Sequence, residues 1–341
     1  MNEKIHTQAL PWEGTVNGEE IAGRRCRREM TTLGFGMFAF MLSIQLSSVG
    51  LVLLLRQFWP SLLSSGWVML GINALCIYII GFLVLYAIVC RVPTWDRADR
   101  PVQKITLGRL LSLFTVSYSA GILSNIIAQV INQLIKLATG KWNVNPLEDM
   151  MDQSYPLPAM FLYMVIAAPI VEELIFRGVL LNRLRKYGDL FAMLSSGLLF
   201  GLFHGNLTQA IFAFACGVAL AYVKLHDGRI WSCIVIHALT NLFGFSAFAL
   251  VRDLNMDMGV EMGVEESIRI LALLLPFLLV VITVIICGIV FGVKLLLNPG
   301  LQRSALPLRG RRLWRMFLLN PGSILFLILT AVLFVLAILA G

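Results

Sequence analysis

The chain has 341 residues, of which 58% are hydrophobic and 13% charged, and its formal net charge is +8. A soluble domain carries about 25% charged residues, so this composition excludes a soluble globular protein and indicates an integral membrane protein. The positive charge does not indicate a nucleic-acid partner, because the basic residues lie beside apolar segments. There they orient a chain in the lipid bilayer and meet anionic headgroups.

Nine apolar segments are long enough to cross a bilayer, which takes about 20 residues. The fifth and sixth are short, so we expect them to cross only if they pack inside the bundle. The sequence therefore predicts an all-α polytopic transmembrane helix bundle of about nine spans with a buried polar active-site cavity. The expected spans are residues 32–56, 67–90, 107–137, 157–181, 189–204, 208–225, 229–250, 268–296 and 322–340.

The connections between these spans alternate in charge. Basic residues dominate the N-terminal segment and the second, fourth, sixth and eighth connections, whereas acidic residues dominate the third and seventh. Under the positive-inside rule this alternation predicts a multi-pass protein with a cytoplasmic N-terminus and an external C-terminus. A count of eight or ten spans would break the alternation.

The spans divide the chain into four parts. These parts are a polar basic cytoplasmic segment (1–31), the first three helices (32–137), helices four to seven (157–250), and the last two helices with a basic connection (268–341, connection 297–321). The basic stretch 302–315 could bind anionic lipid, although a topology signal is the simpler interpretation. The six cysteines include no Cys-x-x-Cys pair, so we expect neither a disulfide framework nor a cysteine metal site. Because the first residues are polar, we expect no cleavable signal peptide.

The fourth expected span carries charge where charge is unfavourable. An ionised residue near the centre of a membrane helix costs about 2.5–3.5 kcal/mol, so we expect Glu172, Glu173 and Arg177 to serve a function. Glu173 and Arg177 are four residues apart and can pair, which leaves Glu172 without a partner in its own helix. A desolvated carboxylate can exchange a proton near neutral pH. A structural ion pair that joins helices is the alternative for Glu173 and Arg177.

The fifth span ends in a histidine beside a small-residue face. Gly197 and Gly201 form a Gly-x-x-x-Gly face that lets another backbone come close, and His204 follows on roughly the same face. Phe200 lies one turn before His204 and adjoins it. An intramembrane histidine at a packed interface is a functional candidate, and a histidine hydrogen-bonded across helices is the structural alternative.

The seventh span contains His237 and Asn241, four residues apart and facing one direction. A neutral imidazole can bind metal or relay a proton, and a carboxamide beside it can orient the ring or donate to an oxyanion. Counting residues from the turns places Glu172, His204 and His237 at one depth, about 12 Å from the cytoplasmic interface. We expect these three side chains to converge in one intramembrane pocket.

Three motifs together resemble the CPBP family of intramembrane proteases, which includes the CAAX prenyl endopeptidases and bacteriocin-processing and immunity proteins. The motifs are Glu172-Glu173-x-x-x-Arg177, Phe200-x-x-x-His204 and His237-x-x-x-Asn241, in this order and each on an expected membrane helix. The resemblance covers roughly residues 157–250 and makes this part the expected catalytic core.

The resemblance implies a role for each motif residue. Glu172 and His204 would activate a water molecule, and His237 with Asn241 would complete the site as an oxyanion-stabilising pair. The residues implied to support the architecture of the site are Glu173, Arg177 and Phe200.

Members of the family are often labelled as metalloproteases, so the resemblance also allows a bound metal. Zinc could be held by Glu172, His204 and His237, but Glu173 would then have to act as the base although it faces Arg177. We therefore favour water activated by Glu172 with no permanently bound metal, and keep zinc as the alternative. The zincin motif His-Glu-x-x-His is absent from the sequence.

The expected function is hydrolysis of a peptide bond in a hydrophobic, membrane-associated or prenylated peptide or protein, near the cytoplasmic face. One alternative is a non-catalytic membrane scaffold or regulator, or a bacteriocin-immunity protein, that retains the fold. Another is a proton-coupled transporter, but the sequence has no paired halves with broken helices, which transporters often have.

Overall fold

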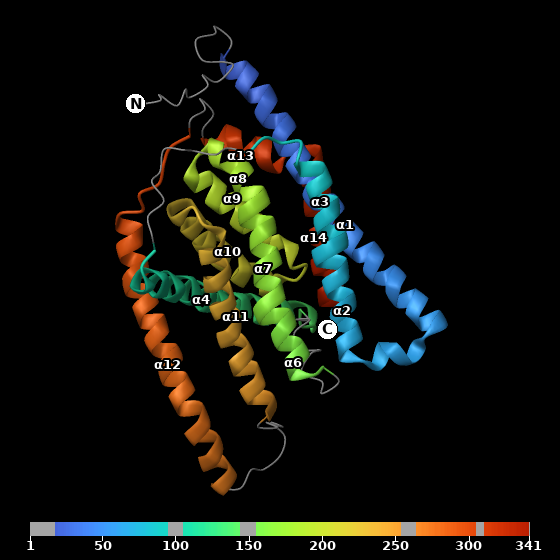
Figure 1. Cartoon of the computed structure of the whole chain (residues 1–341), viewed down its shortest axis with the longest axis vertical. Coiled ribbons are helices and arrows are strands. Elements are labelled where there is room, and N and C mark those ends of the chain that lie inside the picture. Colours follow the sequence, from blue (N-terminus) through green and yellow to red (C-terminus); the bar gives the residue numbers. More distant parts are fainter. Residues whose placement is uncertain (1–17, 95–104, 144–154, 254–263, 305–309, 341) are drawn as a thin grey trace, which may run out of the picture.

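The computed structural model describes residues 18–94, 105–143, 155–253, 264–304 and 310–340. In these segments every regular element is helical (Figure 1). Eight of the helices are long and apolar enough to cross a membrane, and Asp189–Phe203 is a further, shorter apolar helix. The prediction of an all-α polytopic bundle of about nine spans is confirmed.

The first three expected spans correspond to three long helices. Their elements are α1 (Gly18–Phe58), the 3₁₀ turn η1 (Pro60–Ser64), α2 (Gly66–Ala74), η2 (Leu75–Gly81), α3 (Phe82–Val89) and α4 (Leu107–Thr139). The elements α2, η2 and α3 form one continuous helix. In the view of Figure 1, α4 runs across the other long helices.

The fourth expected span is one continuous helix, Leu157–Tyr187, which we call the central helix. Its elements are α6 (Leu157–Met160), η3 (Phe161–Ala167), α7 (Ala168–Glu173), η4 (Leu174–Leu181), α8 (Asn182–Leu184) and η5 (Arg185–Tyr187). The remaining helices are α9 (Asp189–Phe203), α10 (Leu207–Asp227), α11 (Ile230–Asp253), α12 (Val264–Leu297), α13 (Gly310–Leu318) and α14 (Pro321–Ala340).

Helix α1 begins earlier than the expected span 32–56, inside the segment that we expected to be simply polar. Ala22, Cys26 and Met30 recur every four residues, and each is at most 2% exposed. They belong to the same buried cluster as Leu313 and Phe317 of α13. This apolar stripe has the period of a helix, so α1 extends back to Gly18 although the stretch is rich in arginine. Residues 1–17 lie outside the described part.

The two short spans, α9 and α10, pack against each other inside the bundle, as we expected. A Cβ atom on Gly201 would lie 2.5 Å from the Ala210 carbonyl oxygen, and one on Gly197 would lie 3.1 Å from the Phe214 carbonyl oxygen. The two glycines therefore allow the backbones of α9 and α10 to touch. Asn206 caps α10, because its side chain accepts a hydrogen bond from the backbone N–H of Gln209 (2.9 Å).

The basic connections meet at one end of the bundle, which lies near α8 and α13 in Figure 1 and which we call the basic end. The contacts that join them are Lys186 with Glu29, Arg183 Nε to the Val89 carbonyl (2.8 Å), the Gln302 N–H to Asp189 Oδ2 (2.9 Å), and His226 Nε2 with the Pro299 carbonyl (3.0 Å). At the opposite end, which we call the far end, Lys141 Nζ donates to the Leu339 carbonyl (2.7 Å).

This gathering agrees with the charge alternation, because the even-numbered connections share one end. Which end faces the cytoplasm stays a prediction. The acidic residues of the third connection, Glu148, Asp149 and Asp152, lie outside the described residues.

Candidate active site

A cavity of ≈ 540 Å³ lies inside the bundle, and its lining includes the four residues expected to be catalytic. Glu172 comes from the last turn of α7, His204 follows the end of α9, and His237 and Asn241 come from α11. We call this space the site cavity. The expected convergence of Glu172, His204 and His237 in one intramembrane pocket is thus present in the structure.

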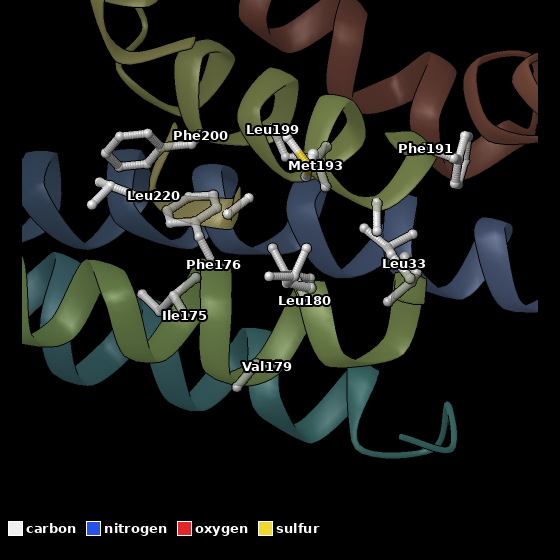
Figure 2. Close-up of a cluster of buried hydrophobic side chains, with 14 of the residues drawn as sticks. Leu33, Ile175, Phe176, Val179, Leu180, Phe191, Met193, Leu199, Phe200 and Leu220 are labelled. Carbon is white, nitrogen blue, oxygen red and sulfur yellow. The ribbon is translucent and has the colours of Figure 1, made fainter. Parts of the chain in front are cut away.

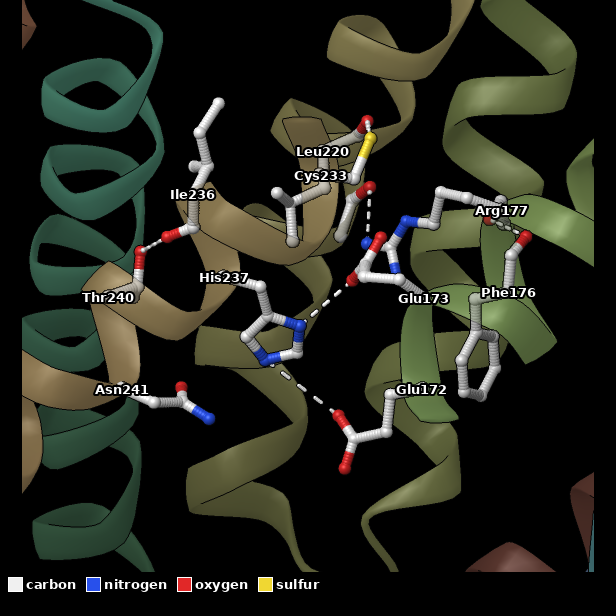
Figure 3. Close-up of polar contacts among 12 residues, drawn as sticks. Glu172, Glu173, Phe176, Arg177, Leu220, Cys233, Ile236, His237, Thr240 and Asn241 are labelled. Atoms are coloured by element: carbon white, nitrogen blue, oxygen red, sulfur yellow. Dashed lines mark hydrogen bonds and ion pairs between the residues drawn. The ribbon is translucent and has the colours of Figure 1, made fainter. Parts of the chain in front are cut away.

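Glu173 is not among the lining residues of the site cavity, and it has two partners (Figure 3). Its Oε1 lies 3.0 Å from Arg177 Nη1 and accepts a hydrogen bond from His237 Nδ1 (2.8 Å). Arg177 Nη2 also donates to the Gly217 carbonyl of α10 (3.1 Å), and the side chains of Glu173 and Arg177 are both 0% exposed. The expected pair is present, and it joins the central helix to both α10 and α11.

The contact between Glu173 and His237 fixes the imidazole. A carboxylate can only accept, so Nδ1 carries the hydrogen and Nε2 of the neutral ring is left with a lone pair. This Nε2 faces the cavity, 3.8 Å from Glu172 Oε2 (Figure 3). No sequence pattern indicated this contact, because the two residues are far apart along the chain.

His204 has a comparable arrangement at the end of α9. Its Nδ1 lies 2.9 Å from the Phe200 carbonyl, which can only accept, so Nε2 is again the nitrogen left with a lone pair. Asn206 Nδ2 donates to the His204 carbonyl (3.1 Å), and this holds the residue at the turn between α9 and α10.

Phe200 packs against three polar members of the site. The rings of His204 and His237 meet it edge-on, with centroids 5.1 and 5.7 Å from its own. The Arg177 guanidinium carbon lies 4.7 Å from the centroid of the Phe200 ring. The structure therefore places this aromatic ring between both histidines and the buried cation.

Asn241 lines the cavity, and its side chain also joins two helices. In η3 the Ala168 N–H bonds to the Tyr163 carbonyl five residues earlier. The next residue, Pro169, has no N–H to continue this register toward the Met164 carbonyl. Asn241 Nδ2 donates to that carbonyl (2.8 Å), so α11 supplies what the proline lacks. The second N–H of the Asn241 amide remains available as a hydrogen-bond donor.

The two Nε2 atoms and the Glu172 carboxylate are chemically suited to zinc, and the Glu173 contact is of the kind that orients a metal-binding histidine. In the described residues, however, no three His, Cys, Asp or Glu side chains lie close enough together to hold a metal ion. The conformation of Glu172, His204 and His237 in this structure does not fit a three-ligand site.

Sequence reasoning missed several polar residues of the cavity wall. Tyr78 of η2 stacks on Tyr163 of η3 with ring centroids 5.7 Å apart, and Asn73 and Gln209 also line the cavity. The available signal was the presence of polar side chains in apolar spans, but uncharged ones are too common in membrane helices to stand out.

Comparisons with known proteins address the same part of the chain. Residues 154–243 match the family described as Type II CAAX prenyl endopeptidase Rce1-like. A protein of Bacillus subtilis (strain 168), named "Putative membrane peptidase YdiL", is 33% identical over 94 residues, which cover 27% of this chain and 38% of that protein. No solved structure matches the chain. The matched segment spans the helices that carry the site, and it covers well under two thirds of the length of the curated relative.

Proposed function

We propose that the protein is an intramembrane endopeptidase in which Glu172 activates a water molecule to attack a peptide bond. The observation that carries the proposal is the isolation of this carboxylate. Glu172 is the only Asp or Glu among the described residues that line the site cavity, and its side chain is 12% exposed. Glu173 is occupied by Arg177 and His237, so Glu172 is the carboxylate free to take up a proton.

In the proposed reaction Glu172 takes the proton of a water molecule, and the oxygen attacks the carbonyl carbon of the substrate. The tetrahedral intermediate carries a negative oxygen, to which the remaining N–H of Asn241 can donate. Collapse of the intermediate breaks the C–N bond, and Glu172 returns the proton to the leaving amine. His204 holds the water through its Nε2 lone pair.

The position of His237 refines its expected role. With the Nδ1 hydrogen held by Glu173, the neutral ring accepts at Nε2 and cannot donate to an oxyanion there. His237 could therefore stabilise an oxyanion only after it takes up a proton at Nε2. We propose that His237 shares the proton with Glu172 during the reaction.

The substrate class follows from the lining of the cavity. Apolar side chains such as Met41, Met164 and Phe245 line it together with uncharged polar ones. This surface suits a hydrophobic peptide segment of a membrane-associated protein, lipidated or not. The proposal includes no bound metal as a resident cofactor.

The direct test compares purified wild type with Glu172→Gln on a panel of hydrophobic peptides. The substitution keeps the size of the side chain and removes the group that titrates, so we expect cleavage to fall at least about 10²-fold while thermal stability in detergent stays nearly unchanged. Glu20→Gln, at a 66% exposed side chain of α1, is the matched control and should cleave like wild type. Near wild-type cleavage by Glu172→Gln would refute the assignment, and a stable protein that cleaves no peptide would favour the scaffold alternative.

A further inference from the structure

Along α11 and the central helix, the site cavity extends to one side only of the candidate catalytic residues. On α11 its lining begins at His237 and continues to Phe248, and on the central helix it runs from Met160 to Glu172. Residues 173–187 and 230–236, all of them described, contribute nothing to the lining. Because Tyr187 and Ile230 lie toward the basic end, the cavity extends from Glu172 away from that end.

The other walls agree with this direction. Helix α1 runs from Glu29 at the basic end toward Phe58, and it lines the cavity with Met41 to Ser48, in its later half. Helix α10 approaches the basic end at its last residue, and its lining residues begin at Gln209, near its first turn. The central helix, α1 and α11 therefore place most of the cavity between the catalytic residues and the far end.

Toward the basic end the floor of the cavity is closed. Phe176, Leu180 and Leu220 are at most 1% exposed and pack in one apolar cluster between the helices (Figure 2). Cys233 and Ile236 of α11, each 0% exposed, belong to the same cluster. A peptide could not pass this densely packed layer without displacing it.

From two exposed lining residues we infer where the mouth of the cavity lies. Among the lining residues that the structure describes, Gln45 of α1 and Gly244 of α11 are the exposed ones. Gly244 lies 14 residues after Ile230, the first residue of α11, which is about 21 Å along the helix at 1.5 Å per residue. The hydrocarbon core is about 30 Å thick, so the mouth lies in the half of the membrane near the far end.

Among the described lining residues of the cavity, Glu172 is the only carboxylate, and His204 and His237 are the only basic side chains. No Lys, Arg or Asp is among these described residues, and the other polar ones are uncharged, such as Gln45, Ser48 and Asn73. A charged substrate side chain would leave water here without gaining a partner, which is unfavourable. Neutral side chains can be accommodated next to the methionines and phenylalanines.

We propose that the substrate reaches Glu172 from the far end, through the mouth between Gln45 and Gly244, and that the segment admitted is uncharged around the scissile bond. Under the positive-inside rule the far end is external, so the substrate would enter the cavity from the external side. The sequence had instead suggested cleavage near the cytoplasmic face. The proposal rests on the proposed peptidase function for its substrate, but the direction of access can be tested without activity.

The first experiment labels single cysteines with a membrane-impermeant maleimide in sealed vesicles of each orientation. Cys90, exposed at the end of α3, marks the basic end once the other five cysteines are replaced. In a chain without native cysteines, Ser61→Cys in η1 marks the far end and Gly244→Cys reports the mouth. A Cβ atom at Gly244 meets nothing within 4 Å, so this cysteine does not disturb the packing.

We expect Gly244→Cys to react from the same side as Ser61→Cys and from the side opposite to Cys90. Labelling from the side of Cys90 would overturn the proposal. The proposal would also be overturned if Gly244→Cys is not labelled from the side of Ser61→Cys although a membrane-permeant maleimide reacts with it. Glu172→Gln should leave the pattern unchanged, because access does not depend on catalysis.

The second experiment narrows the mouth. Gly244→Trp should reduce kcat/KM for a neutral peptide by at least about tenfold, mainly through KM. Gly71→Trp is the matched control, because Gly71 is also exposed with nothing within 4 Å of an added Cβ and does not line the cavity. Equal activity of the two variants would overturn the assignment of the mouth.

A third experiment measures the substrate preference of the wild-type protein. A neutral peptide and versions with Lys or Asp next to the cleaved bond should differ by at least about tenfold in kcat/KM. Equal rates would refute the charge preference. If wild type cleaves none of them, the proposed function fails, whereas the labelling pattern still decides the direction of access.

Discussion

Glu173 and Arg177 show how single residues hold this site, since each is fully buried and each contacts groups on other helices. Breaking a buried ion pair by removing one partner costs about 3–5 kcal/mol, because the remaining charge stays in an apolar setting. We therefore expect Arg177→Ala to lower thermal stability in detergent strongly, and far more than Glu172→Gln does.

The matched control for Arg177→Ala is Arg24→Ala. Arg24 also faces a glutamate four residues away, Glu20, at 3.8 Å, but both side chains are mostly exposed. Exposed pairs contribute little, so this variant should melt like wild type. Equal midpoints for Arg177→Ala and Glu172→Gln would refute the structural role of the buried pair.

Whether the site binds zinc also depends on individual residues. Glu172 cannot be both zinc ligand and base, and Glu173 is engaged by Arg177 and His237. We predict that purified active protein contains well under one zinc per chain and keeps its activity after dialysis against a strong chelator, as measured by elemental analysis and peptide cleavage. Stoichiometric zinc, with activity lost on chelation and restored specifically by zinc, would contradict this and make Glu172, His204 and His237 the ligands to test.

The sequence predicted which residues meet at the site but not how they are connected. Helix periodicity places Glu173 beside Arg177, and depth along the chain aligns Glu172 with His237. Contacts such as His237 with Glu173, or Asn241 with the Met164 carbonyl, depend on helix rotation and on the break at Pro169. Hydrophobicity does not specify helix rotation, so these contacts were not predictable.

At the scale of elements, the contact between α9 and α10 positions His204. A Cβ atom on Gly201 would lie 2.5 Å from the backbone oxygen of Ala210, closer than real Cβ atoms come. We predict that Gly201→Ala forces the helices apart, destabilises the protein by about 1–3 kcal/mol and lowers peptidase activity by displacing His204. Thermal melting and cleavage of one neutral peptide measure both effects.

The same substitution at an open position serves as its control. Gly50 lies in α1, where an added Cβ meets nothing within 4 Å, so Gly50→Ala should be neutral or slightly stabilising. If Gly201→Ala is as stable and as active as Gly50→Ala, the close contact of α9 with α10 is not needed for the site.

The presence of the long helices could be predicted from hydrophobicity. Their π-helical segments and the exact start of α1 could not. Apolar length identified all the long helices, because a membrane span needs about 20 apolar residues. The π-helical segments η2, η3 and η4 carry no such signal, since their residues are as apolar as those of the α-helical turns beside them. The early start of α1 was missed because the stripe of Ala22, Cys26 and Met30 is outnumbered by arginines.

At the scale of the whole molecule, contacts between distant segments bear on topology. The connections with Lys186, His226 and Pro299 meet at the basic end, and Lys141 bonds to the carbonyl of Leu339 at the far end. The positive-inside rule assigns the basic end to the cytoplasm. On that assignment we expect the final residues of α14 to lie toward the external side.

We therefore predict that a fluorescent protein fused to the N-terminus fluoresces, and that alkaline phosphatase fused after Ala340 is active, because that enzyme folds only outside the cytoplasm. The reverse fusions should be inactive, and a phosphatase inserted after Arg303, at the basic end, should be inactive as well. Active phosphatase at Arg303 with inactive phosphatase after Ala340 would mean that the bundle is inverted. The mouth of the site cavity would then face the cytoplasm, although its place relative to the basic end would be unchanged.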